Sequence, residues 1–179
     1  MANKAENEAP AGETRLGREI RQTRPFQSPA DEAAVGLIRT ADMVNRRFAT
    51  LFEPFGITTQ QYNVLRILRG ARPEPLPTME IAERMIQAAP GITRLLDRLD
   101  DKGLVRRKRC ADDRRQVLCT ITPAGLDLLE VLEEPVARET ESALDMLTEG
   151  EVRRLIRLMD RIRARLETRD GESAAEPSS

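Results

Sequence analysis

The period of the hydrophobic pattern changes near residue 103, and this change limits the possible folds more than any other feature of the sequence. Before it, apolar residues recur every three or four positions, as on one face of a helix. After it, residues 104–110 and 116–122 alternate between apolar and polar, and the segment ADDRR separates the two runs like a turn. The sequence therefore predicts a β-hairpin that directly follows a helix.

Two short helical segments precede this hairpin. Thr78 is expected to cap the segment MEIAERM, whose apolar residues include Ile81 and Met85. Pro90 is expected to open a second segment, which ends at Gly103. Two short helices joined by a tight turn form a helix-turn-helix, and a hairpin behind them is a wing. We predict a winged helix-turn-helix over about residues 76 to 122, within a mainly α-helical chain.

Longer helices are predicted on the N-terminal side of this unit. Ser28 is a suitable cap for a helix that Pro54 and Gly56 end, and Thr58 forms a capping box with Gln61 at the start of the next. Residues 1–28 are polar and are expected to form a flexible extension, with at most a short helix capped by Thr14.

Two further helices are predicted after the hairpin. The first starts at Thr122 and is expected to kink at Pro135. The second has a capping box of Thr148 and Glu151, and residues 169–179 are expected to be a disordered tail. The last helix carries a long apolar stripe that needs a partner, either the first long helix of its own chain or a second chain. The stripe consists of Leu155, Met159, Ile162 and Leu166.

Composition excludes several classes of function. The 179 residues contain no histidine and only two cysteines, which argues against a zinc site and against acid–base catalysis by histidine. We expect no cofactor and no metal, and nothing in the sequence supports an enzyme. No apolar run is long enough to cross a bilayer and the N-terminus has no apolar signal segment, so we expect a cytoplasmic protein without membrane contact.

Positive charge is concentrated at the predicted wing, although the net charge of the chain is only −1. A basic stripe on an otherwise acidic protein is typical of a surface that contacts DNA, and its alternative interpretation is a solvated charged hairpin. The basic residues of this stripe are Lys102, Arg106, Arg107, Lys108, Arg109, Arg114 and Arg115.

The stretch from TMEIAERM to ITPAG resembles the multiple antibiotic resistance regulator (MarR) family. The match is carried by ITRLLDRLDDKGLVRR, by the DRR at 113–115 and by ITPAG at 121–125, and the preceding ITTQQYNVLRIL is similar to the second helix of that family. The resemblance covers roughly residues 30 to 168. It implies a homodimeric transcriptional regulator, usually a repressor, that binds a palindromic operator in double-stranded DNA and is often released by a small aromatic or anionic effector.

The resemblance also implies a division of the chain. Residues 58–122 would form the DNA-binding domain, and residues 29–57 and 123–168 would form a helical dimerisation region. Two-fold symmetry would place the two reading helices about 34 Å apart, which is one turn of DNA.

Particular residues are candidates for contact with DNA. Arg94 is suited to a bidentate contact with guanine, or alternatively to a phosphate contact or an intrahelical pair with Asp97. Arg114 matches the arginine that enters the minor groove in this family, and Asp113 resembles its orienting partner. Phosphate contacts position a protein without specifying sequence. The full candidate set is Thr78, Pro90, Gly91, Thr93, Arg94, Arg98, Arg107, Arg109, Asp113, Arg114 and Arg115.

The sequence departs from the family pattern at the start of the reading helix. Ala88 and Ala89 stand where the family often has a serine, and Gly91 stands where it has a polar residue. The loss of a side-chain cap costs about 1 kcal/mol, whereas a glycine allows close approach of the backbone to DNA. The bases that this helix reads therefore do not follow from the family.

Alternative functions remain open at this point. Cys110 lies among basic residues that favour a thiolate, so a redox switch at the wing is one alternative, whereas Cys119 is expected to be a core residue. A winged helix that binds protein instead of DNA is another, although it would not need a basic hairpin. No motif marks an effector site. Residues that could line one, but that are more often core or surface, are Phe48, Phe52, Tyr62, Arg39, Arg46 and Arg47.

Overall fold

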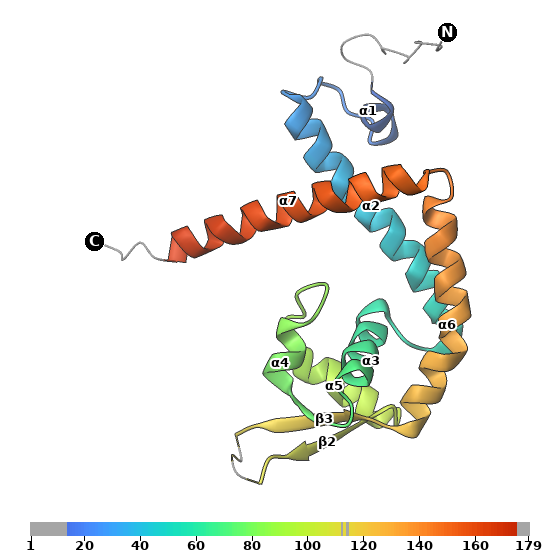
Figure 1. The fold of residues 1–179 in the computed structure, drawn as a ribbon, viewed down its shortest axis with the longest axis vertical. Helices are drawn as coiled ribbons and strands as arrows, with labels where there is room; N and C mark the ends of the chain where they lie inside the picture. The colour runs from blue at the N-terminus through green and yellow to red at the C-terminus, as the bar shows by residue number, and fades with distance from the viewer. Residues whose placement is uncertain (1–13, 112, 114, 175–179) are drawn as a thin grey trace. The chain divides into compact units, whose positions relative to one another are not determined.

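The computed structural model describes residues 14–111, 113 and 115–174, with the backbone alone for 169–174. It is mainly helical with a small antiparallel sheet, which confirms the fold class predicted from the sequence (Figure 1). The elements in chain order are α1 (Arg15–Glu19), α2 (Pro29–Phe52), the 3-10 turn η1 (Glu53–Phe55), α3 (Thr59–Ala71), β1 (Leu76–Pro77), α4 (Thr78–Glu83), α5 (Ile92–Asp101), β2 (Val105–Arg109), β3 (Val117–Ile121), α6 (Pro123–Leu144) and α7 (Glu149–Ala174).

The chain divides into two compact units, residues 1–130 and 131–179. The first unit holds α1 to α5, the sheet and the start of α6, and the second holds the remainder of α6 and α7. None of the helices in the described part is long and apolar enough to cross a membrane.

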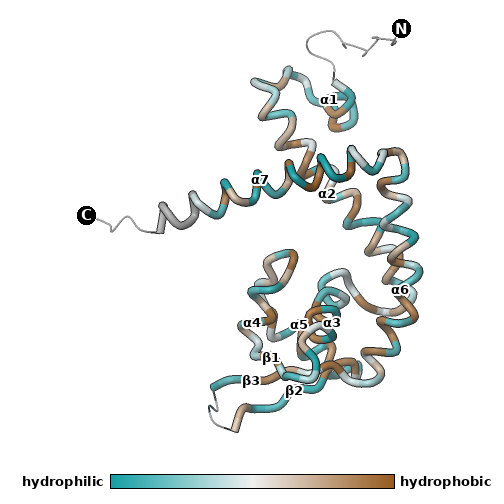
Figure 2. Tube along the Cα trace, in the orientation of Figure 1, coloured by the Kyte–Doolittle hydropathy of each residue, from teal (hydrophilic) through white to brown (hydrophobic). Residues whose placement is uncertain are grey.

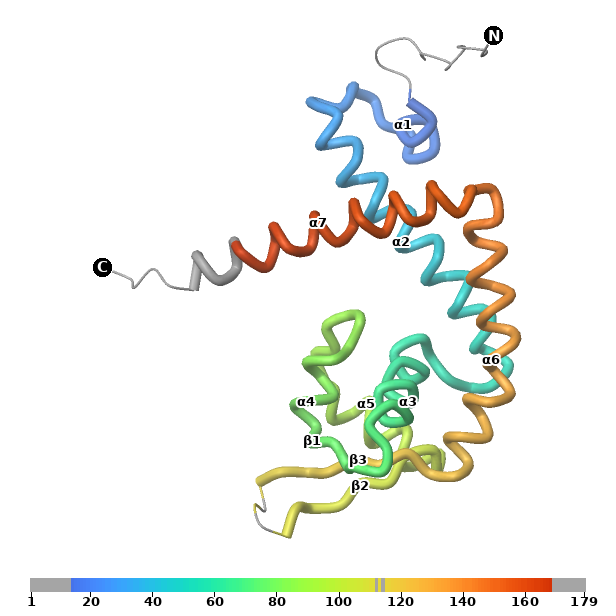
Figure 3. Tube along the Cα trace, viewed as in Figure 1, coloured from blue at the N-terminus to red at the C-terminus, as the bar shows by residue number. Residues whose placement is uncertain are grey.

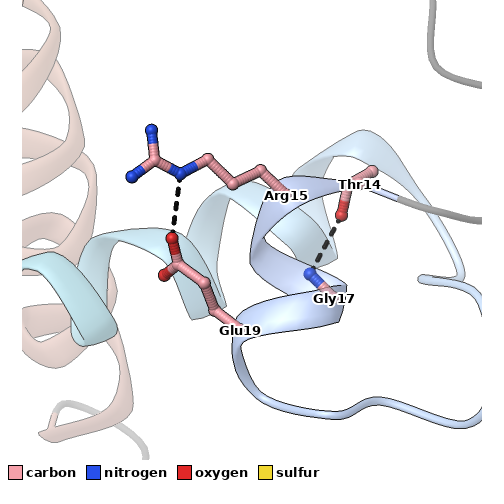
Figure 4. Close-up of polar contacts among 4 residues, drawn as sticks. All are labelled: Thr14, Arg15, Gly17 and Glu19. Atoms are coloured by element: carbon pink, nitrogen blue, oxygen red, sulfur yellow. Dashed lines mark hydrogen bonds and ion pairs between the residues drawn. The ribbon is translucent and has the colours of Figure 1, made fainter.

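Polar side chains cap the N-terminal helices as their sequence predicts. Thr14 Oγ1 accepts a hydrogen bond from the Gly17 backbone N–H at 3.1 Å, and Arg15 pairs with Glu19 one turn later (Figure 4). Leu16 of α1 lies against α2, because a Cβ placed on Gly36 would be 3.4 Å from its methyl group. The N-terminal extension therefore contains a short helix that packs on the first long one.

Side-chain caps also fix the starts of α2 and α3. Ser28 Oγ accepts from the Asp31 N–H at 3.1 Å. Thr58 and Gln61 form the predicted capping box, with each side chain accepting from the backbone N–H of the other at 3.1 and 3.2 Å. Between the two helices the chain turns through η1 and Gly56, whose φ of 64° suits glycine.

The starts of the two short helices differ from the sequence prediction. Thr78 is not the cap of α4 but its first residue, and its hydroxyl instead donates to the Val117 carbonyl at 3.2 Å. The preceding residues form β1, a strand that three prolines in the loop made hard to recognise. Helix α5 begins at Ile92, two residues later than expected, because Gly91 adopts a φ of 95° that no helix can contain. Figure 3 traces α4, this turn and α5 in succession.

The core of the first unit is built mainly from aliphatic side chains. Its fully buried residues come from α3, α4, α5, the sheet and the first part of α6, and α3, α4 and α5 lie on the same side of the sheet (Figure 1). Burying each such side chain contributes about 1.5–3 kcal/mol. The members are Val64, Leu65, Leu68, Leu76, Ile81, Leu96, Leu99, Val105, Cys119 and Leu129.

The sheet has the order β1-β3-β2 and is antiparallel throughout. Cys119 in the central strand pairs with Leu76 of β1 on one side and with Arg107 of β2 on the other. The long hairpin β2–β3 extends beyond the helices as the predicted wing (Figure 1). Its register places Val105 opposite Ile121, so the base of the wing is attached to the core.

The junction between the wing and α6 is tightly packed. Thr122 Oγ1 donates to the Gly103 carbonyl at 2.7 Å and accepts from the Gly125 N–H at 3.1 Å. A Cβ added to Gly125 would lie 2.4 Å from the Leu104 carbonyl oxygen, which is closer than any real contact. Glycine is required here by close approach of the backbone.

The second unit contains the later part of α6 and all of α7. Helix α6 passes through Pro135 without interruption. The predicted capping box begins α7: Thr148 donates through its backbone N–H and its hydroxyl to Glu151, which lowers the pKa of that carboxyl group. Helix α7 continues to Ala174, so residues 169–174 are helical where we expected a disordered tail. In the part of α7 that Figure 2 colours by hydropathy, hydrophobic and hydrophilic residues are interspersed.

We predict that Gly125→Ala destabilises the protein by about 1–3 kcal/mol, because the new methyl group displaces the Leu104 backbone. Thermal unfolding measures the effect. The matched control is Gly150→Ala near the start of α7, where a Cβ meets nothing within 4 Å and the melting temperature should stay equal or rise. Equal melting temperatures for Gly125→Ala and the wild type would contradict the close approach.

Candidate nucleic-acid interface

Helix α5 has one buried face and one exposed face. Leu96 and Leu99 are fully buried, and Ile92 and Leu95 pack against the same core. The opposite face is exposed and contains Thr93, Arg94 and Arg98 together with Asp97 and Asp101.

The N-terminus of α5 is open. Gly91 is its N-cap and provides no side-chain hydrogen bond, while the Leu95 N–H bonds to the Gly91 carbonyl at 3.2 Å. Pro90 and Gly91 are exposed in the turn that precedes the helix. An uncapped N-terminus presents backbone N–H groups and the positive end of the helix dipole, which attract an anion such as phosphate.

Arg94 is free to contact a ligand. It makes no ion pair and no side-chain hydrogen bond with any residue that the structure describes. The intrahelical pair with Asp97 that the sequence allowed is absent, because Asp97 pairs with Arg107 of β2 instead. Arg94 and Thr93 are therefore both exposed at the first turn of α5.

The basic residues of the wing divide between two faces, as strand alternation requires. Arg106, Lys108 and Arg109 are exposed, whereas only 17% of the Arg107 side chain is. Arg107 is a candidate for DNA contact in the sequence, but its side chain is largely buried and pairs with Asp97 of α5. Lys102 is not part of this exposed basic group, because its ammonium group donates a hydrogen bond to the Gly56 carbonyl.

Asp113 organises the turn of the wing. Its carboxylate accepts from the Arg115 backbone N–H at 3.0 Å and from the Gln116 side chain at 3.2 Å. The Gln116 N–H bonds to the Asp113 carbonyl at 2.9 Å, and the Cys110 N–H bonds to the Gln116 carbonyl at 3.0 Å. Arg115 is exposed beside this turn. Arg114 lies outside the described residues, so its predicted partnership with Asp113 stays a prediction.

Four of the predicted residues line one hollow between α4, the first turn of α5 and the wing. They are Thr78, Thr93, Arg107 and Arg115. The sequence did not point to the other residues that line this hollow. These residues are Pro77, Met79, Glu80, Glu83, Gln116 and Val117. Pro90, Gly91, Arg94, Arg98, Arg109 and Asp113 are not among the lining residues.

The two cysteines differ in environment and form no disulfide. Cys119 is completely buried, and burial raises the pKa of its thiol although a hydrogen bond with Thr78 and the nearby Arg107 charge oppose the shift. It is a core residue, as predicted. Cys110 is half-buried at the end of β2.

The aromatic residues considered for an effector site pack on one another. The rings of Phe52 and Tyr62 stack with centroids 4.5 Å apart, Phe48 and Phe52 are 6.1 Å apart, and Phe52 is buried. Arg39 and Arg46 both pair with Asp42, at 3.8 and 2.9 Å. This packing favours the core and surface interpretation of these residues. Within the described residues no group of three or more Cys, Asp or Glu is placed to hold a metal ion.

Comparison with known proteins gives consistent matches. A sequence model of the MarR family matches residues 55–116. An HTH-type transcriptional regulator of Bacillus cereus is 31% identical over 135 residues, which cover 75% of this chain and 88% of that protein. The crystal structure of a MarR transcription factor from Planctomyces limnophilus is 47% identical, with a TM-score of 0.60, and the match covers 75% of this chain and 98% of that one.

A DNA-bound structure shares the fold as well. The S. aureus MepR–DNA complex matches with a TM-score of 0.66 over 72% of this chain and 94% of that chain. Its sequence identity is 22%, so this likeness concerns the fold.

We predict that the two thiols differ in reactivity in the native protein. A thiol reagent should modify Cys110 quickly and Cys119 only on unfolding, because Cys119 is buried and its raised pKa disfavours the reactive thiolate. Timed labelling with mass spectrometry checks this. Cys110→Ser should remove the fast phase, and a fast phase that persists in this variant would contradict the burial of Cys119.

Proposed function

This chain belongs to the MarR family of transcriptional regulators, and we propose that it represses transcription by binding a palindromic DNA operator as a homodimer. In this proposal residues 58–122 bind DNA, and residues 29–57 and 123–168 form the dimerisation region. A small aromatic or anionic effector would release the DNA.

The observation that carries DNA binding is a group of unpaired cations on α5, on strand β2 of the wing and in the turn of the wing. Each of them is exposed and has no ion-pair partner among the residues that the structure describes. Unpaired arginines and lysines can neutralise phosphates without first breaking an ion pair, so no such free-energy penalty opposes DNA binding. The group consists of Arg94, Arg98, Arg106, Lys108, Arg109 and Arg115.

Groove geometry supports the same assignment. The exposed side of α5 carries a threonine and two arginines, and a helix of this kind fits the major groove with its N-terminal residues at the base edges. The wing beside it would reach the backbone or the adjacent minor groove. A winged helix that binds protein would need neither the basic wing nor the exposed Thr93 and Arg94. MepR, which shares the fold, was crystallised with DNA.

Exposed apolar side chains support the homodimer. On α7, Leu158 and Ile162 are 43% and 46% exposed, and Leu166 is 56% exposed. On α2, within the other unit, Ile38 is 71% exposed. A monomeric protein rarely leaves such stripes in water, and a second copy would bury them.

We predict steeply salt-dependent binding of the full chain to the DNA upstream of its own gene. Arg94→Ala should weaken specific binding by about 1–3 kcal/mol, since it removes a base contact, and Arg114→Ala should weaken it as well. Fluorescence anisotropy over a salt series measures both effects. Arg15→Ala, an equal change of charge on α1, is the control and should bind like the wild type. Salt-insensitive or absent binding by the folded wild type would rule out the proposal.

We predict that Ile162→Lys converts the dimer to a monomer, because a charge in a buried apolar interface is costly. Light scattering during size-exclusion chromatography gives the mass. Glu167→Lys places the same side chain at a polar position of α7 and should remain dimeric. A dimeric Ile162→Lys variant would exclude this stripe from the interface.

A further inference from the structure

Arg107 joins the wing to the reading helix by a single charged contact. Its guanidinium Nη1 pairs with the carboxylate of Asp97, which lies on the exposed side of α5. Asp97 belongs to α5, which is proposed to enter the major groove, and Arg107 belongs to the wing, which is proposed to contact the DNA backbone or minor groove. The ion pair therefore connects the two proposed DNA-binding elements.

The burial of the two partners is unequal. The side chain of Arg107 is 17% exposed and that of Asp97 is 49% exposed. The Arg107 Nε is buried and has no hydrogen-bond partner in the described part of the chain. Cys119 is the cross-strand neighbour of Arg107, and burial raises the pKa of its thiol. Asp97 is thus the one carboxylate in this part of the chain that forms an ion pair with the arginine.

The position of the pair on the strand matters for the wing. Val105, at the base of β2, is fixed in the core, whereas Lys108 and Arg109 beyond Arg107 are exposed. Within the described residues, the pair of Arg107 and Asp97 is the ion pair that joins β2 to α5. On the other strand of the hairpin, β3 is held by its pairing with β1 and by the Thr78 hydroxyl. Loss of the ion pair would remove the charged contact that holds the β2 side of the hairpin to α5.

We propose that Arg107 is a positioning residue that does not contact DNA but holds the wing, through Asp97, at the angle at which wing and helix bind the operator together. This inference rests on the proposed DNA-binding function. It assigns Arg107 a role different from that of the exposed Arg109, which lies two residues away and is expected to contact phosphate.

The two roles predict opposite results for one substitution. Asp97 is an acidic group beside the proposed DNA surface, so its neutralisation should strengthen binding if only charge matters. If Asp97 holds Arg107 in place, Asp97→Asn should instead weaken binding, since the wing is no longer fixed. The direction of the effect separates positioning from simple electrostatics.

The experiment measures operator affinity over a salt series for the full-length wild type and five variants. These are Asp97→Asn, Arg107→Gln, the double variant, Arg109→Ala as the phosphate-contact reference, and Asp101→Asn as a matched change of charge on α5. We expect Asp97→Asn and Arg107→Gln each to lose about tenfold in affinity with an unchanged salt slope. The double variant should lose no more than either single one. Arg109→Ala should lower the slope by about one, and Asp101→Asn should bind at least as tightly as the wild type.

Other results would overturn the inference. An Asp97→Asn protein that binds as tightly as the wild type or more tightly removes the positioning role, and a lower salt slope for Arg107→Gln makes Arg107 a phosphate contact. Thermal unfolding shows whether each variant is folded at the temperature of the assay. If Arg107→Gln does not fold, Asp97→Asn decides, because it changes only a half-exposed carboxylate. A wild type that does not bind the operator refutes the proposed function itself.

Discussion

The burial of Leu96 and Leu99 against α3 and the sheet is the constraint on which the rest of the structure depends. A helix of ten residues that buries these two leucines has only one orientation, and that orientation turns Thr93 and Arg94 to solvent. The same core fixes the base of the wing through Val105 and Cys119. Hydrophobic packing thus determines which polar groups are available to DNA.

Charge is then distributed over this scaffold in two ways. Some arginines form ion pairs within the protein, as Arg107 does with Asp97. Others, such as Arg94 and Arg109, remain exposed without a partner in the described residues. The difference follows from strand alternation and helix periodicity, so neighbouring residues of one basic run have separate tasks.

The sequence predicted the elements whose signals are local. The capping boxes at Thr58 and Thr148 and the period-two alternation of the hairpin each depend on a few neighbouring residues. It did not predict contacts between distant residues. The Thr78 hydroxyl is used by Val117, thirty-nine positions away, and Asp97 by Arg107, and no local pattern reveals either choice. The late start of α5 likewise depends on the positive φ of Gly91. A glycine allows a positive φ but also adopts negative values, so the sequence alone does not predict it.

In the proposed complex, two copies of α5 and its wing bind one operator symmetrically. Hydroxyl-radical footprinting of the full chain on its operator tests this claim most directly, because protection maps the sugar–phosphate backbone. Symmetric binding predicts two protected tracts related by two-fold symmetry and centred about one turn of DNA apart, because the two reading helices would lie about 34 Å apart. A single asymmetric tract, or no protection at concentrations where the protein is folded, would contradict it.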